Sequence, residues 1–228
     1  MINLSHSLEA AHWEAALRYA PDLYFDVLEP FKPDRVGVTV FEATAPSPSF
    51  DRVVEVDGSQ TMMAIEYAIY WDYDIQHLYE LEHVWIFVGP DGDIVHCECS
   101  SHGHRLIGLL RDRSNLSSDG RVQLFSQPGK HAMSPIAEFF RLMPTASSCC
   151  MEDAGNDGLL EPAMFRGELR TRPDSDLLAR RCLQQYRFQP SFEYALHAWD
   201  PSLFVSWEQL RREIPIRLNA LLASLAGE

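Results

Sequence analysis

The sequence lacks the features that would assign it to a membrane or to a nucleic acid. No stretch is both long and apolar enough to span a bilayer, and residues 1–20 lack the basic start and continuous apolar run of a signal peptide. The 19 Lys and Arg residues stand against 33 Asp and Glu residues, and the net charge of −14 repels phosphate backbones and anionic lipid surfaces. We therefore expect a cytoplasmic protein without a transmembrane segment that does not bind nucleic acid. The arginine-rich stretch 105–121 is a local exception, which we interpret as a solvated loop.

A disulfide framework and a serine-hydrolase motif are also missing. The five cysteines are an odd number without a secretory signal, so we expect reduced thiols. No Gly-x-Ser-x-Gly turn occurs, which argues against Ser100 as a hydrolase nucleophile. Cys97, Cys99, His102 and His104 offer soft ligands for zinc, but the Cys-x-Cys spacing differs from that of structural zinc sites. We interpret these cysteines as small buried residues of a strand.

The middle of the chain carries the pattern of a β-sheet protein. Residues 61–74 are rich in aromatic and β-branched side chains and predict a buried strand. Residues 82–88 and 94–99 flank a five-residue loop with two glycines, which predicts a β-hairpin. We therefore predict a mainly β fold, an antiparallel two-sheet β-sandwich over residues 20–135.

Helical patterns lie outside this core. Residues 7–20 predict an N-terminal helix with Ser7 as its N-cap, and residues 174–186 and 206–225 predict two more helices. Pro215 is expected to kink or split the last helix, because proline lacks the amide proton that a helix interior needs. The chain is thus predicted as one domain, 1–228, with a loop-rich and helical extension at 136–228 packed on the core (α+β by content).

Two carboxylates lie in a segment that otherwise has the composition of a core strand. Alternate side chains of a strand share a face, so Glu80 and Glu82 are expected to point the same way, toward the core. Arg and Lys are absent from Glu66 to Gly103, which leaves a metal ion or a buried histidinium as the local source of positive charge.

The acids and the histidine of this region form a ligand set for a divalent cation. We expect Ca²⁺ or Mg²⁺ at this site, because both ions prefer carboxylate oxygens as ligands. Mn²⁺ and Zn²⁺ are alternatives, because one of the candidate ligands is an imidazole. The alternative interpretation is that these residues are solvated loop acids entering a strand. The candidate metal ligands are Asp72, Asp74, His77, Glu80 and Glu82.

Four segments, in this order, resemble the superfamily of necrosis- and ethylene-inducing peptide-like (NLP) cytolysins and the related vacuolar-protein-sorting-associated proteins. The segments are YAPDLYFDVLEPFKPDRV, HLYELEHVWIFV, SSHG and SQPGKHAMSP, within residues 19–135. The second resembles the cytolysin heptapeptide Gly-His-Arg-His-Asp-Trp-Glu, with His77 on its first histidine, Glu80 on its aspartate and Glu82 on its glutamate. Gln76 and Tyr79 depart from that pattern.

The resemblance implies a two-sheet β-sandwich with a divalent-cation site, which in the cytolysins helps to bind sugar headgroups of plant sphingolipids. His77, Glu80 and Glu82 are the implied ligands, with an upstream aspartate, Asp72 or Asp74. It also implies that His102 and His131 lie near the site.

Three functions are open at this point. The first is a binding module whose cation bridges the protein to a small polar ligand, a sugar or a phosphoryl compound, with Lys130 contacting an anionic group. The second is a metal-dependent hydrolase in which His102 or His131 transfers protons. The third is a structural or interaction protein in which the carboxylates and histidines form a metal-free hydrogen-bonded network.

Overall fold

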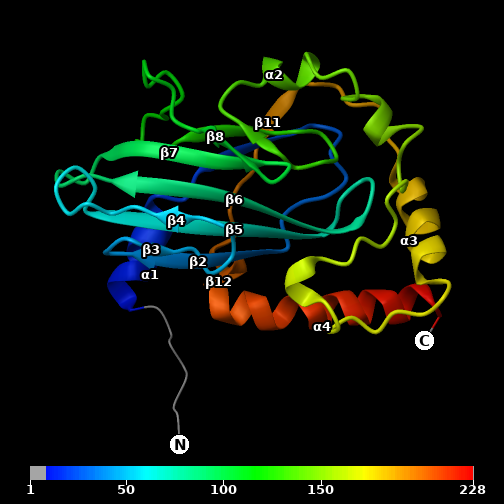
Figure 1. Cartoon of the computed structure of the whole chain (residues 1–228). Helices are drawn as coiled ribbons and strands as arrows, with labels where there is room; N and C mark the ends of the chain where they lie inside the picture. Colours follow the sequence, from blue (N-terminus) through cyan, green and yellow to red (C-terminus); the bar gives the residue numbers. More distant parts are fainter. Residues whose placement is uncertain (1–8, 228) are drawn as a thin grey trace, which may run out of the picture.

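The chain folds into two packed β-sheets with helices around them, in a computed structural model that describes residues 9–227 (Figure 1). The larger sheet has the strand order β12-β2-β5-β6-β7-β8, and the smaller sheet has the order β10-β9-β1-β11. The larger sheet comprises β12 (Phe204–Ser206), β2 (Arg35–Phe41), β5 (Met63–Tyr73), β6 (Leu78–Val88), β7 (Ile94–Ser101) and β8 (His104–Ile107). The smaller sheet comprises β10 (Met133–Ser134), β9 (Gln123–Ser126), β1 (Asp22–Asp26) and β11 (Tyr194–Leu196). The prediction of a mainly β sandwich with helical additions is confirmed.

The remaining elements are short strands and helices. A separate pair is formed by β3 (Ala45–Pro46) and β4 (Val53–Val54). The α-helices are α1 (Ala10–Arg18), α2 (Glu138–Arg141), α3 (Ser175–Leu183) and α4 (Trp207–Leu225). The 3-10 helices are η1 (Ser148–Cys150), η2 (Ala163–Phe165), η3 (Gln184–Tyr186) and η4 (Pro201–Leu203). No helix within residues 9–227 is long and apolar enough to cross a bilayer.

The C-terminal region contributes to both sheets. Strand β11 pairs with β1 in the smaller sheet, and β12 pairs in parallel with β2 in the larger one. Helix α4 then lies along the outer face of the larger sheet, where apolar side chains such as Leu210 and Ile214 pack against Tyr70 (Figure 1). The extension therefore adds strands to the sandwich as well as packing on it, and β12–β2 and β1–β9 are parallel pairs.

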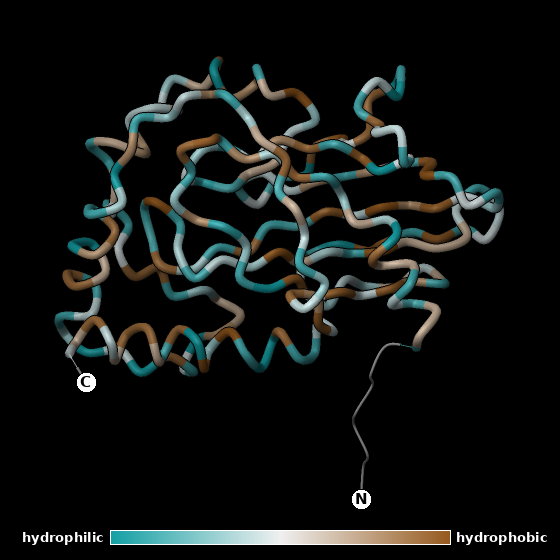
Figure 2. Tube along the Cα trace, turned by 180° about the vertical axis from the view of Figure 1, so that it is seen from behind, coloured by the Kyte–Doolittle hydropathy of each residue, from teal (hydrophilic) through white to brown (hydrophobic). Residues whose placement is uncertain are grey.

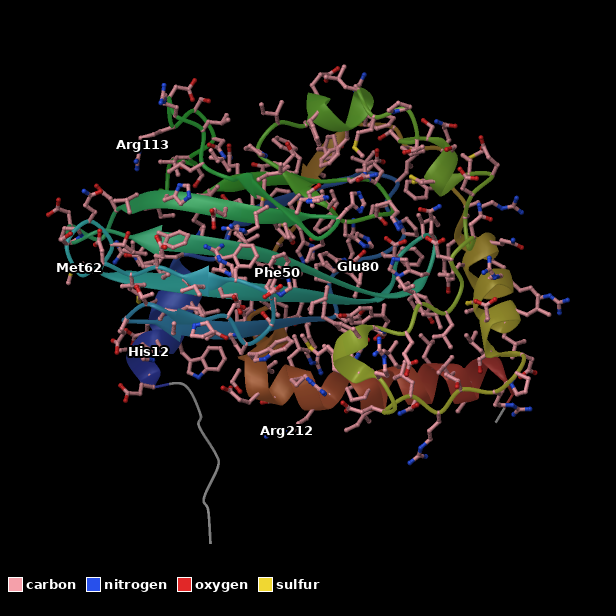
Figure 3. The ribbon with its side chains drawn as sticks, viewed as in Figure 1. His12, Phe50, Met62, Glu80, Arg113 and Arg212 are labelled. Carbon is pink, nitrogen blue, oxygen red and sulfur yellow. The ribbon has the colours of Figure 1, made fainter. Side chains whose placement is uncertain are left out.

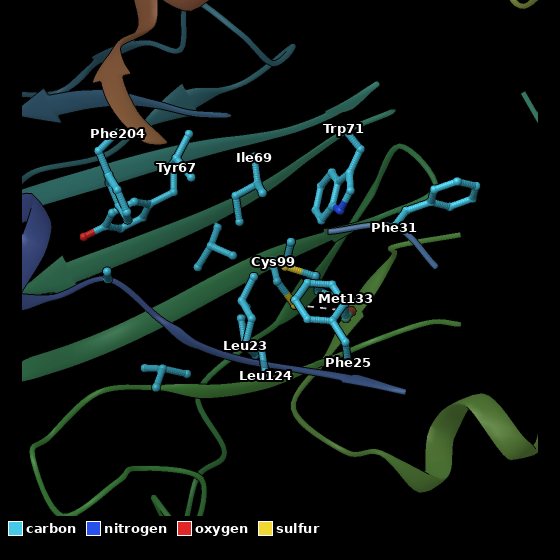
Figure 4. Close-up of a cluster of buried hydrophobic side chains, with 14 of the residues drawn as sticks. Leu23, Phe25, Phe31, Tyr67, Ile69, Trp71, Cys99, Leu124, Met133 and Phe204 are labelled. Carbon is cyan, nitrogen blue, oxygen red and sulfur yellow. Dashed lines mark hydrogen bonds between the residues drawn. The ribbon is translucent and has the colours of Figure 1, made fainter. Parts of the chain in front are cut away.

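The core lies between the two sheets. Tyr67, Ile69 and Trp71 of β5 face Leu23 and Phe25 of β1, and all five side chains are essentially inaccessible to solvent (Figure 4). Hydrophobic residues follow the central strands, whereas α4 alternates apolar and polar residues along its length, as a helix with one buried face does (Figure 2). Burial of apolar surface between the sheets is thus the main source of stability.

The structure refines two details of the predicted helices. Helix α1 begins at Ala10 with Glu9 at the N-cap, and the expected cap Ser7 lies outside the described residues. Helix α4 continues through Pro215 to Leu225 instead of splitting, and Ser206 caps it by accepting a hydrogen bond from the Gln209 amide at 3.3 Å. Packing of the buried face outweighs the single backbone hydrogen bond that proline removes.

Candidate metal centre

The strand register brings both glutamates to the inner face of the larger sheet. Glu82 pairs with Ile69 and Glu80 pairs with Trp71 across the β5–β6 ladder, so the carboxylates share the face of these core residues. Glu82 is 3% exposed, and the side chain of Glu80 is 16% exposed. Figure 3 labels Glu80 in a region crowded with side chains near the start of β6. The predicted common face of the two glutamates is confirmed.

The loop between β5 and β6 carries the other members of the site. The Asp74 amide donates to the His77 carbonyl at 2.9 Å, which closes a tight turn. The C-terminal region holds this turn in place, because the Leu78 amide donates to the Gly158 carbonyl at 2.9 Å. Gly158 has φ +60°, and a Cβ there would lie 2.3 Å from Asp176 Oδ1, so this position requires glycine.

Asp74, His77 and Glu80 form a cluster whose ligand atoms all lie within 4.8 Å of one another. His77 Nε2 lies 3.8 Å from Asp74 Oδ1 and 3.8 Å from Glu80 Oε2, which is too far for a hydrogen bond. Its Nδ1 lies 3.3 Å from the Leu78 carbonyl oxygen, which can only accept, so this contact requires the proton on Nδ1. With the proton on Nδ1, a neutral ring would direct its Nε2 lone pair toward two carboxylates, an arrangement that needs a proton or a cation between them.

Asp74 also accepts hydrogen bonds from two other groups. Lys130 Nζ donates to Asp74 Oδ1 at 2.7 Å, and the Gln76 amide donates to the same oxygen at 2.7 Å. The other oxygen, Oδ2, is buried and has no hydrogen-bond partner within the described part of the chain. Asp74 therefore keeps one carboxylate oxygen available for a further positive group.

The Glu82 carboxylate is bound by Ser100 of β7 and by the backbone of His102. Its Oε2 accepts a hydrogen bond from the Ser100 hydroxyl, and its Oε1 accepts one from the His102 amide at 3.3 Å. These contacts fix the carboxylate against β7 and leave Asp74, His77 and Glu80 as the three groups that converge.

The pKa values reflect this crowding of acids. Burial, with the charges of Glu82 and Asp74, raises the pKa of Glu80 to about 7. Burial and Asp74 raise the pKa of Glu82 to about 7, although the hydrogen bonds from Ser100 and His102 oppose the shift. Burial also opposes ionisation of Asp74, but attraction by Lys130 and the nearby histidines outweighs it and lowers that pKa. The region thus holds one firmly ionised acid beside two acids that resist ionisation.

The two histidines proposed for proton transfer are not members of the Asp74–His77–Glu80 cluster. His102 is exposed, and its Nε2 lies 2.8 Å from Gln127 Oε1. His131 is fully buried, stacks on Trp71 with ring centroids 4.5 Å apart, and has Nε2 3.5 Å from Glu29 Oε1. His131 is therefore enclosed in the core, without exposure to a substrate.

Asp72 is not part of the cluster, contrary to the expectation for that residue. Because side chains alternate along β5, Asp72 lies on the outer face with Tyr70, whose hydroxyl donates to it at 2.8 Å. Arg217 of α4 donates to both of its carboxylate oxygens and to Asp34 Oδ1 at 2.9 Å. Asp72 thus anchors α4 to the sheet.

Replacing Asp72 by asparagine tests this separation of roles. We expect a loss of roughly 1–3 kcal/mol in the free energy of unfolding, because charge-assisted hydrogen bonds from Arg217 are weakened. The response of the melting temperature to divalent cations should stay as in the wild type. A cation response that disappears in Asp72→Asn would return this residue to the candidate ligands.

The cysteine–histidine set does not assemble into a metal site. Cys97 and Cys99 are fully buried in the core, whereas His104 is exposed at the start of β8. All five cysteines are free thiols. The interpretation of Cys97 and Cys99 as small buried strand residues is confirmed.

Sequence reasoning missed the groups that reach the cluster from distant parts of the chain. Lys130 meets Asp74 across 56 residues of sequence, and the predicted role of Lys130 as a contact for an anionic ligand did not include this ion pair. Glu29 likewise reaches His131 and accepts from the Gly129 amide at 2.6 Å. The absence of Lys and Arg within 66–103 was a usable signal, since it shows that any counterion must come from another segment.

No family model and no curated protein matches the chain. Among solved structures it is similar to NLPPya in complex with mannosamine, at 18% identity and a TM-score of 0.37 over 56% of this chain and 69% of that chain. It is also similar to a structure described as a toxin fold for microbial attack and plant defense, at 16% identity and a TM-score of 0.37 over 56% and 70%. A mutant of NLPPya matches at 17% identity and a TM-score of 0.35 over 80% and 93%. The structural likeness to NLP toxin-fold proteins is distant, and the vacuolar-sorting part of the resemblance stays a prediction.

Proposed function

We propose that this protein binds a divalent cation through Asp74, His77 and Glu80, and that the cation binds an oxygen of a small polar ligand. The ligand class is a sugar or a phosphoryl compound, whose oxygens suit a hard cation. Ca²⁺ and Mg²⁺ are the expected ions, and Mn²⁺ and Zn²⁺ are the alternatives that one imidazole ligand allows.

One observation carries the proposal, the 3.8 Å separation of His77 Nε2 from both Asp74 Oδ1 and Glu80 Oε2. Metal–ligand distances of about 2.0–2.2 Å allow two ligands of one ion to lie up to about 4.3 Å apart. The observed gaps are therefore too long for hydrogen bonds but fit a shared ion. The contact of His77 Nδ1 with a backbone carbonyl is the outer contact that orients a metal-ligating histidine.

The carboxylates give further support. A cation would supply a partner for the orphaned Asp74 Oδ2 and would neutralise Glu80, which burial otherwise holds partly protonated at neutral pH. The side chains of His77 and Glu80 are 10% and 16% exposed, so an ion between them has a path to solvent on one side. Coordination positions on that side would be filled by water or by a ligand oxygen.

A metal-free network is the second candidate, and the Lys130–Asp74 ion pair favours it. Lys130 Nζ already supplies one positive charge to the acidic cluster, and nearby Asp74 raises the pKa of Lys130 against the effect of its burial. One ammonium group balances one of the three acids, and protons on Glu80 and Glu82 would balance the others. The two candidates differ in whether an ion changes stability.

Ligand binding should depend on the cation. Calorimetric titration of glucosamine and of glycerol 2-phosphate into the protein with Ca²⁺, Mg²⁺, Mn²⁺ or Zn²⁺ should give heat of binding for one of the two ligands. Binding should disappear in EDTA and in His77→Ala, because the ion that contacts the ligand is then lost. The matched control is His104→Ala, which removes an exposed histidine outside the cluster. Equal binding with and without chelator would exclude a cation-mediated contact.

A further inference from the structure

The arginine-rich stretch 105–121 borders an unpaired edge of the larger sheet. Strand β8 is the last strand in the order of that sheet and pairs only with β7. Figure 3 labels Arg113 of this stretch at the upper left of the sandwich, away from Glu80. Nothing in the proposed cation site uses this edge.

The register of β8 shows which backbone groups face outward. The Gly108 amide donates to the Cys97 carbonyl at 2.7 Å, and residue pairs in this ladder alternate between bonded and non-bonded positions. Arg105 and Ile107 occupy the non-bonded positions, so their N–H and C=O groups point away from β7. These groups form a short template for another strand.

An apolar cavity of about 500 Å³ adjoins the same edge. The side chain of Ile107 is 65% exposed, and that of Val95 in β7 is 42% exposed. The cavity is lined by Val95, Ile107, Leu109, Leu110, Arg111 and Arg113, among others. Exposed apolar side chains beside unpaired backbone are the features of a surface that receives an extended peptide.

The arginines at this edge are of two kinds. Arg105 and Arg121 are ion-paired with Glu98 and Asp22, whereas Arg111 and Arg113 line the cavity. Arg111 is exposed and forms no ion pair with any described residue, and Arg113 donates from Nη2 to the Ile94 carbonyl at 2.9 Å. Within residues 9–227, no acidic side chain lines the cavity. An occupant with carboxylates beside its apolar groups would match this surface.

We propose that β8 and the adjoining cavity bind an extended segment of a partner protein that alternates acidic and apolar residues. The segment adds as a strand beside β8, its backbone pairs with Arg105 and Ile107, and its acidic side chains reach Arg111 and Arg113. A second copy of this chain does not fit as the occupant, because its β8, His104–Ile107, has no carboxylate to pair with Arg111 and Arg113.

The test uses a synthetic peptide, acetyl-Glu-Val-Asp-Val-Glu-Leu-Asp-amide, titrated into the ¹⁵N-labelled full-length protein. We expect binding with hydrogen-exchange protection of the Arg105 and Ile107 amides. Arg111→Glu should weaken binding by about tenfold, since an attraction becomes a repulsion. The matched control is Arg212→Glu on α4, an exposed arginine away from this edge, which should bind as the wild type does (Figure 3).

Three results would overturn the proposal. The first is equal binding of a peptide with lysine in place of each acid, and the second is undiminished binding of a peptide with proline at alternate positions, which cannot pair as a strand. The third is the absence of binding at millimolar peptide. A dimer in solution that is lost in Ile107→Asp, or binding to vesicles of anionic phospholipid in place of the peptide, would assign the edge to a different occupant.

Discussion

Replacing Asp74 by alanine is expected to lower the free energy of unfolding by about 3–5 kcal/mol when measured in chelator. The Asp74 side chain is fully buried and accepts from Lys130 Nζ at 2.7 Å, and the Lys130 side chain is 9% exposed. Its loss leaves an ammonium group with little access to water and no partner of opposite charge at hydrogen-bond distance. Urea unfolding followed by tryptophan fluorescence measures this change.

Two further variants make the result specific to the ion pair. The double variant Asp74→Ala with Lys130→Met should recover part of the stability, because no charge is then left unpaired. Asp157→Ala removes an exposed acid from the adjoining C-terminal loop and should change stability by no more than about 0.5 kcal/mol. Simple additivity of the losses from Asp74→Ala and Lys130→Met would show that the two groups do not stabilise each other.

The second large effect is a loss of stability with rising pH in the absence of metal. Burial, together with the neighbouring acids, raises the pKa of Glu80 from 4.5 to about 7 in the folded protein. Below pH 4.5 both states are protonated, and between pH 4.5 and 7 the unfolded state releases its proton first, which favours unfolding. The contribution of Glu80 is thus fully present below its unfolded pKa and is lost as the pH rises through 7.

The difference between the wild type and Glu80→Gln measures the contribution of Glu80 together with its interaction with Glu82. Burial lowers the pKa of His83 to about 3, so His83 makes stability rise with pH. It is present in both proteins, and its effect cancels in the difference. In EDTA the wild type should lose roughly 2–3 kcal/mol relative to Glu80→Gln between pH 4.5 and 7.5. A saturating cation should remove most of this loss, because the ionised carboxylate then has a partner. A flat difference across this range in EDTA would mean that Glu80 is not desolvated in the folded state.

The elements that depend only on neighbouring residues could be predicted from the sequence. The hairpin at 82–99 followed from two β-rich runs around a glycine-containing loop, and the common face of Glu80 and Glu82 followed from the two-residue period of a strand. The cluster of Asp74, His77 and Glu80 lies within seven residues, so its members could be named without knowledge of the fold.

The parts that could not be predicted depend on contacts between distant segments. Asp72 lies between Trp71 and Tyr73 in the sequence. Because side chains alternate along β5, it points to the outer face of the sheet, where it contacts Arg217, 145 residues away. The pairing of β12 with β2 places α4 on that face, and no local pattern near Asp72 indicates it. Lys130, between β9 and β10, and Gly158, in the C-terminal region, likewise reach the Asp74–His77 turn only through the tertiary fold.

The most direct test of the cation site is elemental analysis of the purified protein after dialysis against equal concentrations of Ca²⁺, Mg²⁺, Mn²⁺ and Zn²⁺. We predict one divalent ion per chain in the wild type and in Asp72→Asn, and none in His77→Ala or Glu80→Gln. The bound ion should raise stability by about 2.7 kcal/mol at a hundredfold excess over its dissociation constant. A wild-type protein without a bound ion, with the same melting temperature in EDTA and in each cation, would contradict the account and leave the Lys130–Asp74 network as its replacement.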